Sequence, residues 1–139
     1  MKIMVSACLL GENCKYSGGN NRDERVLAFL KGHEVIPVCP EIMGGLPTPR
    51  PPAEIVGGEV INKLGVSVDH EYRLGAAKAL EIAMREKIDL AILQSRSPSC
   101  GVKQIYDGTF TGTKIPGQGI FAGQLMANGF AVLDREDVE

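Results

Sequence analysis

Apolar positions follow two different periods along the chain, and the alternation of these periods predicts an α/β fold. Short continuous apolar runs, typical of buried strands, occupy residues 2–10, 34–38, 89–93 and 130–133. Apolar residues at helical spacing occupy residues 21–30, 69–87 and 119–128. Strands that alternate with helices are typical of right-handed parallel crossovers. We therefore predict a single-domain, three-layer α/β/α sandwich with a mostly parallel, Rossmann- or flavodoxin-like sheet and the first strand near its centre.

Local signals mark the ends of the predicted helices. Asn21 precedes the first helix and Asp69 the second, and both residue types accept hydrogen bonds from the first free amides of a helix. Gly129 follows the third helix and is expected to end it. The last five residues, 135–139, are mostly charged, and we expect them to form a solvated tail.

A long segment rich in Gly and Pro, residues 40–67, interrupts the alternation of strands and helices. Connections of this length in a small domain are usually functional. Within the segment, Gly57-Gly58 separates two short apolar runs, which predicts a hairpin with a two-residue turn. Farther along the chain, Asp107-Gly108-Thr109-Phe110 is expected to form a turn.

Length and charge narrow the class of protein. The 139 residues suit one domain, residues 1–139, with a real core. The formal net charge of -2 gives no basic surface for nucleic acid. All apolar runs are too short to cross a bilayer, and no leader pattern precedes the first strand, so we expect no membrane association and a cytoplasmic location. The sequence does not define an oligomeric state.

Three of the four cysteines follow predicted strands. Cys8 ends the first strand, Cys39 follows the second, and Cys100 lies in the Ser-rich loop after the third. Because the carboxyl ends of parallel strands meet at one edge of a sheet, we expect these three thiols to converge. Thiolates that converge repel one another unless a metal neutralises them. Cys14, in a loop, is a fourth ligand, a disulfide partner of Cys8 in metal-free protein, or structural; we favour an accessory role without ligation.

The spacing of these cysteines discriminates among metal sites. Zinc ribbons bring paired Cys-x-x-Cys knuckles, and ferredoxins gather their ligands in one loop. Single cysteines at three separate strand ends are typical instead of a cluster that is seated on a rigid sheet. Three ligands would leave one iron of a four-iron cluster open to act as a Lewis acid. Two alternatives stay open: a sulfur carrier or cluster-bearing module that serves a partner enzyme, and a zinc or redox thiol protein.

Five motifs extend over nearly the whole chain. They are Ser6-Ala7-Cys8-Leu9-Leu10-Gly11, Asn13-Cys14-Lys15-Tyr16, Cys39-Pro40-Glu41, the run Gly44-Gly45-Leu46-Pro47-x-Pro49-Arg50 with Pro52-Ala53-Glu54, and Ser97-Pro98-Ser99-Cys100-Gly101. Together they resemble the domain-of-unknown-function family 523 (DUF523), whose members include the thiouracil desulfidases.

This resemblance implies a function and a set of site residues. It implies that Cys8, Cys39 and Cys100 bind a [4Fe-4S] cluster, which we expect to be lost in air. The activity implied is non-redox removal of sulfur from a thiolated pyrimidine similar to 2-thiouracil, which yields the oxo compound and hydrosulfide. Glu41 is the implied acid/base and Ser97 the implied assisting hydroxyl. The expected partner is this small thiolated substrate.

For the other polar residues of the motifs, the sequence indicates a role less specifically. Arg50 is either a surface charge or a group that neutralises cluster sulfide or a substrate anion, and Glu54 is expected to pair with it. Ser99 is expected to satisfy loop amides, as Ser usually does in turns. Lys15 and Tyr16 either line the pocket or belong to a solvated loop, and we favour the solvated loop.

Overall fold

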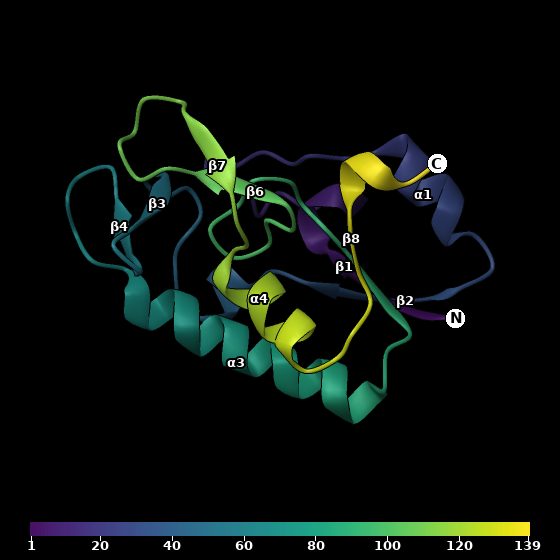
Figure 1. Cartoon of the computed structure of the whole chain (residues 1–139). Helices are drawn as coiled ribbons and strands as arrows, with labels where there is room; N and C mark the ends of the chain where they lie inside the picture. Colours follow the sequence, from purple (N-terminus) through teal and green to yellow (C-terminus); the bar gives the residue numbers. More distant parts are fainter.

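The computed structural model describes all residues, 1–139, and contains a four-stranded parallel sheet between helices (Figure 1). The strand order is β2-β1-β5-β8, and every neighbouring pair is parallel. The bounds are β1 Lys2–Ser6, β2 Glu34–Val38, β5 Leu90–Leu93 and β8 Val132–Asp134. The first strand therefore lies inside the sheet, as predicted, and the chain leaves it toward β2 on one side and reaches β5 on the other. Such a reversal creates a crevice at the carboxyl ends of the strands.

Helices cover both faces of the sheet, which confirms the three layers. Along β1, Ile3 and Val5 point into one apolar cluster with residues of α1 (Glu24–Leu30), while Met4 points into the other. This second cluster contains residues of α3 (Asp69–Glu86) and α4 (Ile120–Ala127). The alternation follows from the two-residue period of a strand. No helix in the structure combines the length and the apolar character needed to cross a bilayer.

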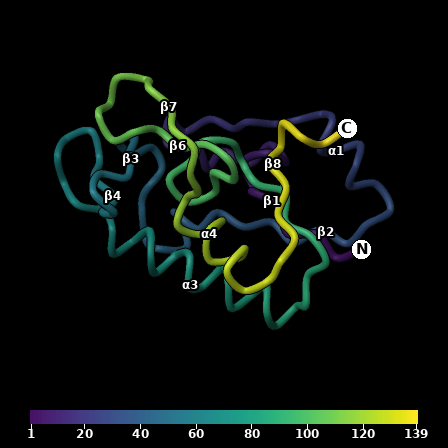
Figure 2. The backbone as a smooth tube through the Cα atoms, in the orientation of Figure 1, coloured from purple at the N-terminus to yellow at the C-terminus, as the bar shows by residue number.

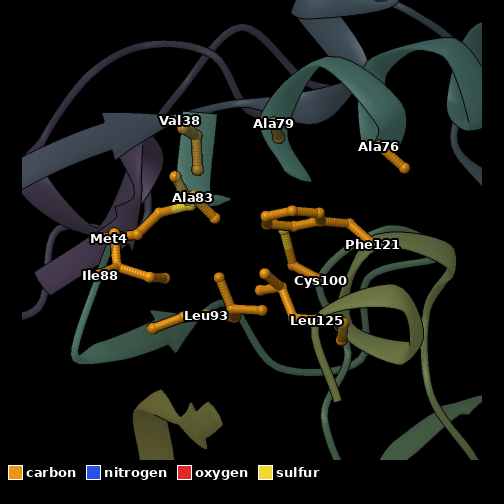
Figure 3. Close-up of a cluster of buried hydrophobic side chains, with 12 residues drawn as sticks. Met4, Val38, Ala76, Ala79, Ala83, Ile88, Leu93, Cys100, Phe121 and Leu125 are labelled. Carbon is orange, nitrogen blue, oxygen red and sulfur yellow. The ribbon is translucent and has the colours of Figure 1, made fainter. Parts of the chain in front are cut away.

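The core under α3 and α4 is built from small residues on one helix and large residues on the other. Ala76, Ala79 and Ala83 of α3 are fully buried and allow the helix to lie close to the sheet. Phe121 of α4 fills the space beside them, and Cys100 lies next to its ring (Figure 3). One candidate ligand is therefore anchored in the core.

Two hairpins extend the molecule at the end opposite the two termini (Figure 2). The first pairs β3 (Ala53–Val56) with β4 (Glu59–Asn62), and its turn residues Gly57 and Gly58 both have positive φ, as a primed turn requires. This hairpin was predicted. The second pairs β6 (Gln104–Tyr106) with β7 (Lys114–Pro116) and was missed, because each strand has only three residues. The turn expected at 107–110 forms part of its tip.

The two predicted N-terminal caps were wrong, whereas Gly129, with a φ of 81°, follows α4 as expected. Asp23, not Asn21, caps α1, and its Oδ1 accepts from the amides of Arg25 (3.0 Å) and Val26 (3.3 Å). At the start of α3 the cap position is occupied by a valine, and Asp69 is the first helical residue. The Asp69 carboxylate accepts instead from the Val60 amide of β4 at 3.0 Å, so it joins the helix to the first hairpin.

The predicted solvated tail was also wrong. Residues 135–137 form a turn of 3-10 helix, and Val138 is only 2% exposed within the α1 cluster. Arg135 donates to the Asp23 carboxylate at 3.0 Å. The buried Val138, which lies between charged residues in the sequence, thus holds the end of the chain against α1.

A short helix that the sequence analysis missed carries Glu41. This helix, α2 (Pro40–Met43), begins with Pro at its first position, where a fixed φ is favourable and no amide is needed. It packs on α3 through Gly44 and Gly75. A Cβ at Gly75 would overlap the Pro40 carbonyl, and a Cβ at Gly44 would overlap the Glu71 carbonyl. The two backbones are therefore in direct contact, which fixes α2 on the end of the sheet.

This contact predicts that Gly75→Ala destabilises the protein. The added methyl forces α2 away from α3, and overpacking of this kind costs about 1–3 kcal/mol. The measurement is the free energy of unfolding from denaturant titration followed by circular dichroism. Gly123→Ala in α4 is the matched control, because its Cβ would meet only Gln118 Cβ at 3.9 Å; we expect it to be neutral or stabilising by up to about 1 kcal/mol. Equal stability of Gly75→Ala and the parent would contradict this packing.

Candidate functional site

The carboxyl ends of β1, β2 and β5 open into one cavity of about 570 Å³. Cys8 lies in the 3-10 turn Ala7–Leu10 that follows β1, Cys39 comes directly after β2, and Cys100 lies in the loop after β5. All three line the cavity. The structure thus brings together thiols that are separated by 31 and 61 positions in the sequence, because their strands are neighbours in the parallel sheet.

Cys14 completes a group of thiols with Cys8 and Cys39. All cysteines are free, and Cys14 is buried in the loop that follows Cys8. Its thiol hydrogen-bonds to both neighbouring sulfurs, which lowers the pKa of Cys8 to about 7 and also lowers the pKa of Cys39. The same hydrogen bonds raise the pKa of Cys14 itself. Cys8 and Cys39 are therefore the thiols prepared for deprotonation, and Cys14 is the proton donor beside them.

Cys100 has a different environment. Complete burial raises its pKa to about 12, although hydrogen bonds from the hydroxyls of Ser6 and Ser99 act in the opposite direction. The Ser99 Oγ lies 3.6 Å from the sulfur. A thiolate at this position needs a bound cation to be stable, since metal binding drives deprotonation of its ligands.

The donor set fits an iron–sulfur cluster better than a single ion. No three Cys, His, Asp or Glu side chains are arranged around one ion position. The three strand-end thiols instead stand around a cavity, on a rigid scaffold. In a cluster each thiolate binds a different iron, so that the ligands surround the group rather than converge on a point. The cysteines that line the cavity are therefore donors of the type that a four-iron cluster takes.

Glu41 faces this cavity from α2 with both carboxylate oxygens occupied. Its Oε1 accepts from the Tyr72 hydroxyl at 2.7 Å and from Arg50, at 3.2 Å for Nε and 3.1 Å for Nη2. Its Oε2 accepts from the hydroxyls of Ser99 (3.0 Å) and Ser97 (3.4 Å). The Glu41 side chain is 14% exposed and that of Arg50 only 5%. Arg50 is thus no surface charge but the buried counter-ion of the candidate acid/base.

The hydroxyls of Ser97 and Ser99 have different hydrogen-bond partners from those that we expected. The Ser97 Oγ accepts from the amides of Ser99 and Cys100, both at 3.1 Å, and Ser97 also lines the cavity. Ser97, not Ser99, therefore satisfies the loop amides. Ser99 is fully buried, and its hydroxyl connects the Glu41 carboxylate, the Ser97 hydroxyl and the Cys100 sulfur.

Arg50 also holds the surrounding loops together. Its Nη2 donates to the Cys14 carbonyl at 2.9 Å, and its Nη1 donates to the Pro47 carbonyl at 3.2 Å. One guanidinium thus joins the Cys14 loop and the Pro-rich segment to Glu41. The expected pairing of Glu54 with Arg50 was wrong. Glu54 accepts instead from backbone amides of the second hairpin, including that of Phe110.

Several residues of the site escaped the sequence analysis. Tyr72 was not singled out within its predicted helix, yet its hydroxyl donates to Glu41, and burial raises its pKa so that it remains a donor. A buried tyrosine needs a hydrogen-bond partner, which was the available signal. Lys15 and Tyr16 line the cavity rather than a purely solvated loop, and Phe110 lines it from the second hairpin. Their motif and turn were visible in the sequence, but their place at the cavity was not, because loop positions depend on distant contacts.

Comparison with known proteins agrees with this geometry. The chain is 37% identical over 146 aligned positions to "Uncharacterized protein YbbK" of Bacillus subtilis (strain 168), covering 98% of this chain and 97% of that protein. Its fold matches the solved structure of the "[4Fe-4S]-dependent thiouracil desulfidase TudS (DUF523Vcz)" with a TM-score of 0.92 and 39% identity, over 99% of this chain and 92% of that one. The family model described as 2-thiouracil desulfurase matches residues 3–137. The chain belongs to the 2-thiouracil desulfurase family.

Proposed function

We propose that this chain is a [4Fe-4S]-dependent desulfidase that converts a thiolated pyrimidine such as 2-thiouracil, with water, into the oxo compound and hydrosulfide. The observation that carries the proposal is one cavity lined by three strand-end thiols, the ion-paired Glu41 and the Ser97 hydroxyl. Family membership and the similarity to a solved desulfidase support it. In this proposal residues 1–139 act as one domain in the cytoplasm, where thiols stay reduced.

The proposed ligands are Cys8, Cys39 and Cys100. When bound there, a [4Fe-4S] cluster would supply one iron without a protein ligand, a Lewis acid with affinity for the soft sulfur of the substrate. The low pKa values of Cys8 and Cys39 favour the thiolate form that ligation needs. Cys14 is the proposed accessory thiol, because its hydrogen bonds to the two sulfurs beside it raise its pKa and so disfavour the thiolate that ligation needs.

Glu41 is the proposed acid/base, and its surroundings decide which oxygen acts. Arg50 and Tyr72 hold Oε1, whereas Oε2 contacts only serine hydroxyls and is the atom that can exchange a proton. Oε2 takes a proton from the water that attacks the thiocarbonyl carbon and later returns it to the leaving sulfur or to a ring nitrogen. Ser97, which reaches the cavity wall, orients this water or the substrate.

Replacement of single cysteines tests the ligand assignment. We expect Cys8→Ser, Cys39→Ser and Cys100→Ser to lose most of the bound iron and the desulfidase activity, since each removes one of three ligands. Cys14→Ser is the matched control and should keep its iron and its turnover. Iron and acid-labile sulfide are counted after anaerobic purification. Full iron content in any of the first three variants, or loss of iron in Cys14→Ser, would refute the assignment.

Replacement of Glu41 tests the acid/base role. Glu41→Gln keeps the size of the side chain but cannot take up a proton, so we expect kcat to fall by about 100-fold or more at unchanged iron content. Tyr72→Phe removes one hydrogen bond to Oε1 and leaves the carboxylate, so its loss should be clearly smaller. The measurement is the initial rate of 2-thiouracil turnover in protein with a full cluster. A Glu41→Gln variant as fast as the parent would exclude the role.

Turnover by the isolated chain distinguishes an enzyme from the two alternatives, which are a sulfur carrier or cluster-bearing module and a zinc or redox thiol protein. The anaerobically reconstituted protein is incubated with 2-thiouracil, and the loss of thione absorbance and the release of hydrosulfide are followed together. We expect uracil and hydrosulfide in equal amounts over many turnovers. A sulfur carrier would show no turnover of the free base, and a zinc or redox thiol protein would fold fully without iron.

A further inference from the structure

We propose that Phe110 contributes to substrate binding by stacking its ring on the planar base of the substrate, and that Glu54 is the positioning residue that holds Phe110 in place. This inference rests on the proposed function, because it assigns a role in the same cavity. It concerns the second hairpin, which supplies neither a thiol nor a proton-transfer group.

Phe110 has no role in the apolar core. It lies at the tip of the β6–β7 hairpin, and hydroxyl-bearing residues surround it in the sequence at Thr109 and Thr111. Its side chain is only half-buried and belongs to none of the three apolar clusters. Phe110 instead belongs to the residues that line the cavity with the three strand-end cysteines and Glu41. An aromatic side chain with this placement is available to contact a ligand.

The backbone of Phe110 is held in an unfavourable conformation. Its φ of 57° lies in the left-handed region, which a bulky residue rarely adopts. The nearby Gly108 and Gly112 also have positive φ, at 92° and 81°, and glycine tolerates such values without steric cost. A phenylalanine kept among these glycines persists only where the surroundings impose its conformation, and such strain is typical of functional sites.

Glu54 imposes this conformation from the neighbouring hairpin. It lies on β3, is only 8% exposed, and its Oε1 accepts from the Gly108 amide at 2.9 Å and from the Phe110 amide at 3.2 Å. Gly108 itself approaches β3 closely, since a Cβ there would lie 2.7 Å from the Ile55 carbonyl oxygen. One buried carboxylate therefore fixes the amides on both sides of Thr109, through hydrogen bonds that its charge strengthens.

The chemistry of the cavity indicates what the ring contacts. In the proposed function the thiols hold the cluster and Glu41 transfers protons, which leaves the flat face of the base without an assigned contact. A pyrimidine presents a flat π face, and stacking on an aromatic side chain is a strong interaction that tolerates different ring substituents. Phe110 carries such a surface, and Tyr106 of β6 is a second aromatic residue that lines the same cavity. The predicted contribution of Phe110 is therefore to binding of the base and not to the rate of the chemical step.

Steady-state kinetics of anaerobically reconstituted enzyme with 2-thiouracil test the role of Phe110. Phe110→Leu keeps an apolar side chain without a π face and should raise KM by about tenfold, at unchanged iron content and with kcat within about threefold. Phe110→Tyr is the matched control, keeps the ring and should leave KM within about twofold. A KM for Phe110→Leu within twofold of the parent would overturn the proposal.

Two variants of Glu54 test the positioning role. Glu54→Ala leaves both amides of the hairpin tip without their acceptor and should reproduce the rise in KM, whereas Glu54→Gln retains an acceptor oxygen and should restore a KM near the parent value. Because both changes act through the same ring, combining Glu54→Ala with Phe110→Leu should add less than twofold to the effect of Phe110→Leu alone. Additive effects of the two changes would show that Glu54 does not act through Phe110.

A binding measurement separates this inference from the proposed function. Calorimetric titration of the reconstituted protein with uracil, the oxo product, reports the affinity for a base with the same flat ring that is not turned over. We expect the Kd to rise about tenfold in Phe110→Leu and to stay near the parent value in Phe110→Tyr. Failure of the parent to release hydrosulfide would refute the desulfidase proposal alone, and an unchanged Kd in Phe110→Leu would refute the stacking proposal alone.

Discussion

The buried ion pair of Glu41 and Arg50 is the interaction on which the candidate site depends. A charged side chain inside a protein is costly unless it is paired and hydrogen-bonded, and removing one partner of such a pair leaves an uncompensated charge. Here the guanidinium uses its remaining donors on the carbonyls of Cys14 and Pro47. The planar, five-donor geometry of arginine makes this possible, and a lysine could not replace it. The pair therefore holds the carboxylate of the candidate acid/base and the positions of two loops together.

The carboxylate is equally constrained from the other side. Glu41 sits on a helix of only four residues, which is held by the direct backbone contact of Gly44 and Gly75 with their partners on α3 and α2. Its second oxygen reaches the Ser97–Ser99 loop that carries Cys100. The candidate acid/base thus connects the ends of two strands that are not neighbours in the sheet, β2 and β5. A proton-transfer group fixed in this way has little freedom to reorganise, as preorganised catalysis requires.

Local patterns predicted the regular elements well and their ends less well. The strands at 34–38 and at the start of the chain, the Gly57-Gly58 hairpin and the long helix α3 were expected from periodicity and turn chemistry. The cap of α1 was misplaced by two residues because Asn21 and Asp23 are both good capping residues. Arg135, at the far end of the chain, pairs with Asp23 and is oriented by the burial of Val138. The choice between two equally good capping residues therefore depends on a tertiary contact, which the local sequence does not show.

What the sequence determined by itself is the place of the thiols. Cys8, Cys39 and Cys100 each follow an apolar run, and strands joined by right-handed crossovers must end at one edge of the sheet, so their convergence follows from chain order and the period of the pattern. Only the tertiary structure decided the partners of Glu41, the division of tasks between Ser97 and Ser99, and the placement of Phe110. These depend on hydrogen bonds between segments that are far apart in the chain, whose energies come from burial and mutual geometry rather than from the identity of neighbouring residues.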